Sequence, residues 1–179
     1  MSLSELKDRI PEYGRDIKLN LESVLTPEGA AGLTPRQIWG VALASAYAVA
    51  GSSVDLVHAV LEEGGSAIDD SLRTAAQGAA TIMAMNNVYY RSIHLMDDPE
   101  LKKRPARLRM NIIGKSGIEK ADFELMCFAV SAIAGCGQCL TAHLNELRKA
   151  GVGDDGIHAS LRIASVINAA QRALLLSEL

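Results

Sequence analysis

The residues of this chain best suited to chemistry are two cysteines and a histidine in its second half. Cys136 and Cys139 form a C-x-x-C pair, and His143 follows four positions after Cys139. Side chains three or four positions apart share one face of a helix, so a helix here brings the two sulfur atoms close enough to form a disulfide with little backbone movement. The spacing therefore suits a reversible thiol–disulfide cycle.

Gly135 predicts a sharp turn before Cys136, which puts this cysteine at or near the N-terminus of the next helix. Free backbone N–H groups and the helix dipole stabilise a thiolate at such a position. On this ground alone Cys136 is the more reactive thiol. His143 shares the face of both cysteines and can accept a proton from Cys139 or Cys136, directly or through a water molecule.

A histidine base needs a group that orients it, and two carboxylates qualify. Glu124 lies twelve residues before Cys136 in an apolar stretch, where a carboxylate is costly unless a partner receives it. We therefore predict a relay of carboxylate, imidazole and thiol formed by Glu124, His143 and the cysteines. Glu146, three positions after His143, is the alternative orienting group.

A zinc site is the main alternative for the same residues, because Cys136, Cys139, His143 and Glu124 would supply four ligands. Thiolates one turn apart on one helix are less usual for zinc than pairs on a knuckle, and the chain has no second C-x-x-C. The pattern therefore favours redox chemistry with no bound metal or cofactor. Cys127 has no partner at useful spacing and is interpreted as a small buried apolar residue.

Length and composition limit the classes of protein that the chain can represent. Its 179 residues fit one domain, 1–179. The net charge is −3 and no Lys/Arg run is interleaved with aromatic residues, which argues against a nucleic-acid partner. No stretch of 18 apolar residues exists, and the charged N-terminus does not resemble a signal peptide, so we expect a cytoplasmic protein without a membrane partner. In that reducing compartment a close cysteine pair is more often catalytic or metal-binding than structural.

Few aromatic residues and abundant alanine predict an all-α fold. A break is expected at Gly51-Ser52-Ser53, an irregular connection over 104–117, and a cap from Asp154 or Asp155 on the last helix. The NNVYY run, 86–90, is interpreted as packing, with the lining of a pocket as the alternative. The predicted helices cover 4–25 with an interruption near Pro11 and Gly14, 35–50 after a Thr34 cap, 54–63, a long segment from Asp69 or Asp70, 121–134, about 136–149, and a last one after 154 or 155.

The two halves of the chain resemble one another. A shift of 86 residues aligns 37–61 with 123–147, so that Ser45 meets Ser131 and Gly51 meets Gly137. We predict pseudo-repeats over about 35–95 and 121–179 that form a duplicated helical core. Only the second copy carries the cysteine pair, since alanine and serine occupy the matching positions in the first copy.

Several motifs of this chain resemble the alkyl hydroperoxidase D family of the carboxymuconolactone decarboxylase superfamily. They are F-E-L-x-x-F-A-V-S-A-I-x-G-C-x-x-C-L-x-A-H over 123–143, R-M-N-I-I over 109–113, M-x-M-N-N-V-Y-Y over 83–90, and I-P-E-Y-G-R-D-I-K-L-N-L over 10–21. The similarity extends over nearly the whole chain. It implies an all-helical fold with a duplicated core, assembled as a homotrimer.

The resemblance also implies a function. Members of the family are thiol-dependent peroxidases that act on alkyl hydroperoxides and serve a partner peroxiredoxin in antioxidant defence, with electrons from dihydrolipoyl groups of a lipoylated acyltransferase. By position, the redox disulfide is Cys136–Cys139 and the proton relay is Glu124 and His143. The family pattern makes Cys139 the attacker of peroxide and Cys136 the more exposed cysteine that closes the disulfide.

One departure from the family concerns Gln138. Close relatives with peroxidase activity often have histidine at this position between the cysteines, whereas glutamine can hydrogen-bond but cannot transfer a proton at neutral pH. We therefore expect Gln138 to modulate the peroxidase step, which is either slower or uses His143 alone, while thiol exchange with a carrier survives. A decarboxylase of the superfamily, which needs no thiols, and a zinc-binding or stress-associated protein are the alternative functions.

Overall fold

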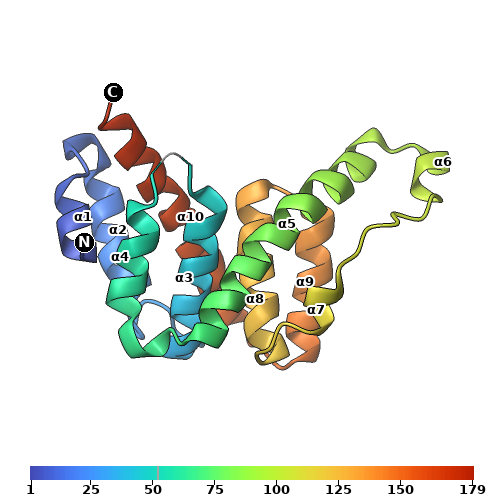
Figure 1. Cartoon of the computed structure of the whole chain (residues 1–179), viewed down its shortest axis with the longest axis horizontal. Helices are drawn as coiled ribbons and strands as arrows, with labels where there is room; N and C mark the ends of the chain where they lie inside the picture. Colours follow the sequence, from blue (N-terminus) through green and yellow to red (C-terminus); the bar gives the residue numbers. More distant parts are fainter. Residues whose placement is uncertain (52) are drawn as a thin grey trace.

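The computed structural model describes residues 1–51 and 53–179, and within them every regular element is helical (Figure 1). This confirms the all-α prediction. The elements are α1 (Leu3–Asp8), η1 (Glu12–Gly14), α2 (Arg15–Val24), α3 (Pro35–Val49), α4 (Asp55–Gly64), η2 (Gly65–Ala67), α5 (Asp70–Met96), α6 (Pro99–Lys102), α7 (Asn111–Gly114), α8 (Lys120–Ala134), α9 (Gly137–Lys149) and α10 (Asp154–Leu176).

Helix boundaries follow local sequence signals. Thr34 caps α3 by accepting a hydrogen bond from the Gln37 N–H, and the Gln37 side chain bonds back to the Thr34 backbone, as the sequence predicts. The predicted aspartate cap of the last helix is wrong, because Gly153 is the N-cap of α10 and the aspartates lie in its first turn. In that first turn their negative charges interact favourably with the positive end of the helix dipole and stabilise α10.

The connections differ from the sequence prediction in two places. The region expected to be irregular between α5 and α8 contains the short helix α7 and is preceded by α6. The predicted break after α3 includes Ser52, which lies outside the described residues.

Helix α8 lies at the centre of the fold and packs against α3, α5, α9 and α10. Its residues from Phe123 to Val130 are buried, and so are the facing residues of α3. Small residues permit these close approaches: a Cβ on Gly40 of α3 would lie 2.7 Å from the Met126 Cε of α8. The buried apolar surface of these helices is the main source of stability for the fold.

The order of the helices is similar in the two halves. Helices α3 and α8 each have 15 residues, and each is followed by a shorter helix and then a long one. The long helix of each half, α5 or α10, packs against both α3 and α8. The predicted duplication of the core stays a prediction.

The molecule has two unequal ends and a projecting arm (Figure 1). Helices α1, α2 and α4 lie at one end with both termini, and α8 and α9 lie at the other. Helix α5 runs obliquely between them, and its C-terminal part extends beyond the body to α6. The chain then returns to α7, which packs close to α5 because Gly78 leaves space for Ile112.

Candidate functional site

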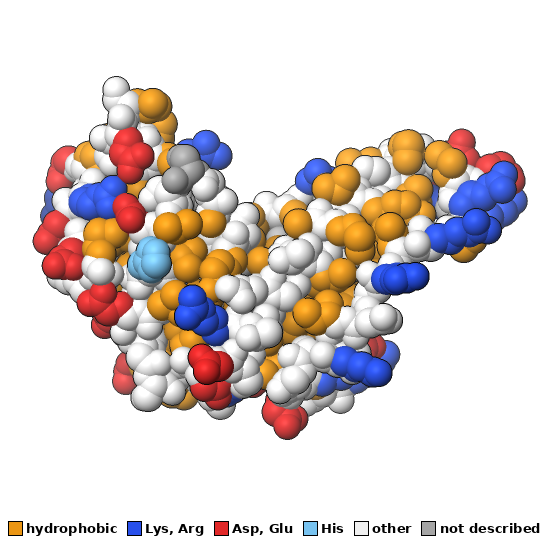
Figure 2. All heavy atoms as spheres, viewed as in Figure 1, with side chains coloured by type: hydrophobic (Ala, Val, Ile, Leu, Met, Phe, Trp, Pro, Cys, Tyr) orange, Lys and Arg blue, Asp and Glu red, His pale blue; other side chains and the backbone are white. Residues whose placement is uncertain are grey.

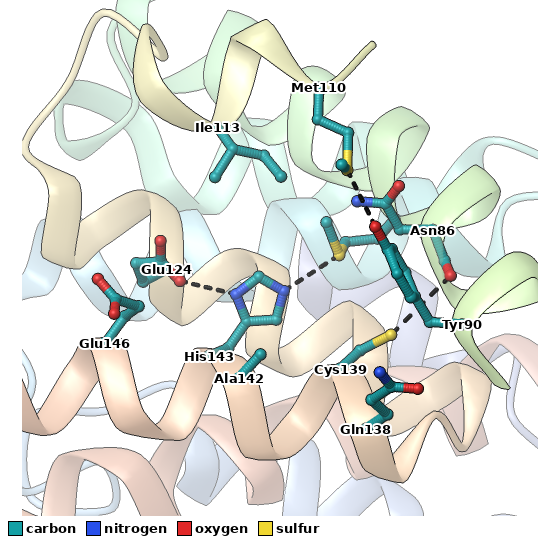
Figure 3. Close-up of a pocket in the computed structure, with 11 residues that line it drawn as sticks. Asn86, Tyr90, Met110, Ile113, Glu124, Gln138, Cys139, Ala142, His143 and Glu146 are labelled. Atoms are coloured by element: carbon teal, nitrogen blue, oxygen red, sulfur yellow. Dashed lines mark hydrogen bonds and ion pairs between the residues drawn. The ribbon is translucent and has the colours of Figure 1, made fainter. Parts of the chain in front are cut away.

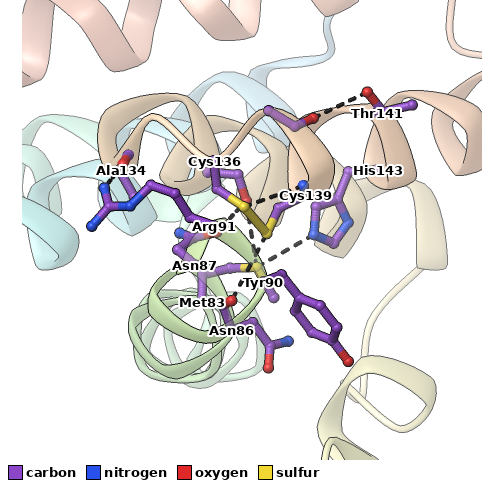
Figure 4. The surroundings of a disulfide bond; sticks show 12 residues. Met83, Asn86, Asn87, Tyr90, Arg91, Ala134, Cys136, Cys139, Thr141 and His143 are labelled. Atoms are coloured by element: carbon purple, nitrogen blue, oxygen red, sulfur yellow. Dashed lines mark hydrogen bonds between the residues drawn. A yellow bond between two sulfur atoms is a disulfide. The ribbon is translucent and has the colours of Figure 1, made fainter. Parts of the chain in front are cut away.

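The turn between α8 and α9 positions the cysteine pair. Gly135 ends α8 in the left-handed region at φ 66°, where glycine has no Cβ penalty, and the Cys136 N–H bonds to the Ser131 carbonyl at 3.1 Å. Arg91 of α5 donates a hydrogen bond to the Ala134 carbonyl and ties α5 to this turn (Figure 4). Cys136 follows this turn as the N-cap of α9, and its sulfur accepts a hydrogen bond from the Cys139 N–H. The predicted helix start is confirmed.

Cys136 and Cys139 form a disulfide with a Cα–Cα distance of 5.3 Å (Figure 4). The structure thus shows the oxidised state of the predicted redox pair. The expectation that Cys136 is the more exposed of the two is wrong here: Cys136 is fully buried, whereas Cys139 retains 6% exposure. The physical reason is that Cys136 occupies the N-cap beneath the α8–α9 turn, while Cys139, one turn further along α9, lines a cavity.

Glu124 and His143 form a buried pair. The Glu124 Oε2 atom lies 2.7 Å from the His143 Nδ1 atom, and the two residues are 2% and 8% exposed. The predicted contact between Glu124 of α8 and His143 of α9 is therefore present in the structure. Glu146, the alternative orienting group, instead pairs with Lys120 and Lys149. The hydrogen bond from Lys120 lowers the pKa of Glu146 to about 2.

A thioether completes the surroundings of the histidine. The Met83 Sδ atom of α5 lies 3.3 Å from the His143 Nε2 atom, on the side opposite Glu124, and 3.5 Å from the Ser131 hydroxyl. That hydroxyl lies 3.0 Å from the Asn87 Oδ1 atom. Sequence reasoning missed Met83 as a site residue, although it begins the M-x-M-N-N-V-Y-Y motif. Only its pairing with a helix 60 residues away identifies it.

One cavity of about 290 Å³ is lined by Cys139, the Glu124–His143 pair and Met83 (Figure 3). Asn86 and Tyr90 of the NNVYY run contribute to it, so for these two residues the alternative of a pocket lining holds in place of packing alone. Gln138 also lines the cavity, and its role as a modulator stays a prediction. The Asn86 Oδ1 atom is buried and has no hydrogen-bond partner within the described residues. The lining comprises Met83, Asn86, Tyr90, Met110, Ile113, Glu124, Gln138, Cys139, Ala142, His143 and Glu146.

The third cysteine stands apart from this chemistry. Cys127 on α8 is a free thiol with no exposed surface. Burial raises its pKa well above the usual value for a thiol. The interpretation of Cys127 as a buried apolar residue is confirmed.

Over residues 1–51 and 53–179, no three His, Cys, Asp or Glu side chains are arranged to hold a metal ion. In the part of the chain that the structure describes, no helix is both long and apolar enough to cross a membrane.

Comparison with known proteins agrees with this fold and site. A model of the carboxymuconolactone decarboxylase family matches residues 99–178, which include both cysteines, Glu124 and His143. An alkyl hydroperoxide reductase AhpD of Rhodospirillum centenum is 47% identical over 97% of this chain and 91% of its own length. Proteins of the same name from Coxiella burnetii and Brucella suis are 48% and 45% identical, over 93% and 97% of this chain and the same shares of their own lengths. The chain therefore belongs to the alkyl hydroperoxidase D (AhpD) family.

Proposed function

We propose that this protein is a thiol-dependent alkyl hydroperoxide reductase that takes its electrons from dihydrolipoyl groups. One observation carries the proposal: the sulfur of a reversible cysteine pair and a carboxylate–histidine pair line the same cavity. The names of the relatives support the same activity. The disulfide favours thiol chemistry over the decarboxylase alternative, which has no use for it.

The first step uses the reduced pair. His143 accepts the Cys139 proton at Nε2, while Glu124 holds Nδ1 and stabilises the imidazolium. The Cys139 thiolate attacks the terminal oxygen of the hydroperoxide, and the O–O bond breaks. The leaving alkoxide takes the proton from His143, so the products are an alcohol and a Cys139 sulfenic acid.

The second step closes the disulfide. The Cys136 sulfur attacks the Cys139 sulfenic acid, and its proton leaves with the hydroxide as water. The product is the disulfide that the structure contains. Gln138 stands between the two cysteines in the sequence, and its side chain lines the cavity. Because glutamine has no titratable proton, His143 alone transfers the proton in this scheme.

A dithiol partner then restores the pair by thiol–disulfide exchange and leaves as its own disulfide. A second hollow of about 590 Å³ supports access for a long arm such as a dihydrolipoyl group, because Tyr90 and Gln138 line both it and the cavity. Lys102 and Arg104 lie on its wall, in a segment, 101–118, that has six basic and no acidic residues. This positive charge favours an acidic lipoylated acyltransferase domain as the electron donor. A peroxiredoxin is a further partner in the proposal.

The test measures consumption of cumene hydroperoxide with dihydrolipoamide as the reductant. We expect the wild type to turn over and both Cys136→Ser and Cys139→Ser to lose turnover, whereas Cys127→Ala, the matched control, keeps it. Full activity in both serine variants would contradict the thiol mechanism. Alkylation of the reduced thiols provides a second arm, since a decarboxylase would keep its activity after this treatment.

Assembly as a homotrimer in the cytoplasm is part of the proposal. Apolar side chains on the projecting arm, Val88, Leu95 and Met96, are each more than half exposed, and Figure 2 shows hydrophobic atoms along the arm with basic groups at its tip. An exposed apolar patch of this kind is typical of an interface. Sedimentation equilibrium should give a mass of three chains, and Leu95→Glu should reduce it. A monomeric wild type would contradict this part.

A further inference from the structure

The thioether of Met83 occupies an unusual place beside the reacting groups. Its Sδ atom lies 3.3 Å from the His143 Nε2 atom, and Met83 and Cys139 line the same cavity. Figure 4 shows the dashed contact between the Met83 sulfur and the His143 ring in the surroundings of the disulfide. The His143 Nε2 atom, the proton donor of the proposed peroxidase step, therefore lies against a thioether in the cavity that Cys139 also lines.

A thioether carries no proton, but it is a nucleophile toward peroxide oxygen. In the reduced protein the Cys139 thiolate is the better nucleophile and consumes the hydroperoxide first. In the disulfide form neither cysteine sulfur is a thiolate, while the cavity still has the Glu124–His143 pair at its wall. Met83 is then the thioether closest to the proton donor, since Met110, the other methionine lining the cavity, lies next to Tyr90 instead.

We propose that Met83 is a site of substrate-driven oxidation, and that excess hydroperoxide converts it to methionine sulfoxide in the disulfide form of the protein. The inference rests on the proposed function, because it needs hydroperoxides to enter this cavity. Its chemical consequence is self-inactivation of the peroxidase when the supply of dithiol fails.

The step balances without any further reactant. The Met83 sulfur attacks the terminal oxygen of the hydroperoxide, the O–O bond breaks, and the sulfur loses two electrons. Protonated His143 gives its Nε2 proton to the leaving alkoxide, and the proton that remains on the transferred oxygen passes to the neutral imidazole. The products are an alcohol and methionine sulfoxide, and His143 ends in the state in which it began.

The product blocks the site for steric and polar reasons. Met83 is 1% exposed, so the added oxygen has to occupy cavity space next to His143. A sulfoxide oxygen is a much stronger hydrogen-bond acceptor than a thioether, and it holds the Nε2–H that the next alkoxide needs. Reduction by a methionine sulfoxide reductase would reverse the block.

The test treats the disulfide form of the full chain with cumene hydroperoxide and follows each methionine by peptide mass spectrometry. Exposure alone predicts that Met96, which is 54% exposed, is oxidised before Met83, which is 1% exposed. We expect the reverse order, and we expect saturating dithiol to protect Met83. Oxidation of Met96 with Met83 unmodified would overturn the proposal.

Two variants separate this inference from the proposed function. His143→Gln should slow Met83 oxidation about 100-fold, the lower range for a positioned general acid, and leave the rate at Met96 unchanged. Met83→Leu should lose activity more slowly under excess hydroperoxide, relative to its own starting rate. If the wild type turns over while Met83 stays unmodified, only the inference fails. If Met83 is oxidised without any hydroperoxide consumption by the thiols, only the proposed function fails.

Discussion

The Glu124–His143 pair allows the sharpest prediction about the mechanism. Glu124→Gln keeps the size of the side chain and an oxygen that can accept the His143 Nδ1–H, but it removes the negative charge 2.7 Å from that nitrogen. The imidazolium that forms when Cys139 loses its proton is then held by a neutral hydrogen bond. Because charge-assisted hydrogen bonds contribute about 1.5–3 kcal/mol and neutral ones about 1 kcal/mol, the loss is about 0.5–2 kcal/mol, with a middle value of about 1.2 kcal/mol. This corresponds to a roughly tenfold slower peroxide step.

The assay is single-turnover consumption of cumene hydroperoxide by the fully reduced protein, so that the reductant does not limit the rate. Glu146→Gln is the matched control: Glu146 lines the same cavity, but it pairs with Lys120 and Lys149 rather than with His143. We expect a loss smaller than about twofold for this control, as for an exposed ion pair. Equal losses in the two variants, or an unchanged rate in Glu124→Gln, would refute the relay.

Three further outcomes follow from the structure. Because the pKa of Glu146 is about 2 in the folded protein and 4.5 ordinarily, its pairing with Lys120 contributes stability above pH 4.5 that disappears as the pH falls toward 2. Urea unfolding across this range should show a flatter dependence for Glu146→Gln than for the wild type. In the reduced protein, iodoacetamide should label Cys139, which lines the cavity, long before Cys127, whose thiol pKa burial raises; equal rates would contradict both assignments. Gly135→Ala should destabilise the fold by about 1 kcal/mol in the same unfolding assay, because a Cβ at φ 66° is strained although no atom lies within 4 Å of it; no loss would exclude a left-handed turn.

Helix positions were largely predictable because they depend on local signals. The Thr34 cap, the left-handed Gly135 and the alanine-rich stretches act within one or two turns of the chain. The predicted Asp154 or Asp155 cap failed by one or two positions, since glycine can also begin a helix when its neighbours supply the favourable charge. Short helices such as α6 and α7 were missed because a single turn has no periodicity to detect.

The cavity is where prediction from the sequence stopped. Cys136, Cys139 and His143 share one helix region, so spacing alone relates them, and Glu124 follows from the cost of burying a carboxylate in an apolar helix. Met83 has no such signal, because a methionine in a helix is ordinarily core.

The sequence by itself determined the helical class, the turn at Gly135, and a cysteine pair one helical turn apart with a histidine on the same face. Only the tertiary structure decided that Glu124 rather than Glu146 receives His143, that Cys139 rather than Cys136 reaches the cavity, and that a thioether faces the histidine. The physical reason is one of range. Caps, turns and helical faces are fixed by neighbours in the chain, whereas the partners of a buried polar group depend on how α5, α8 and α9 pack together.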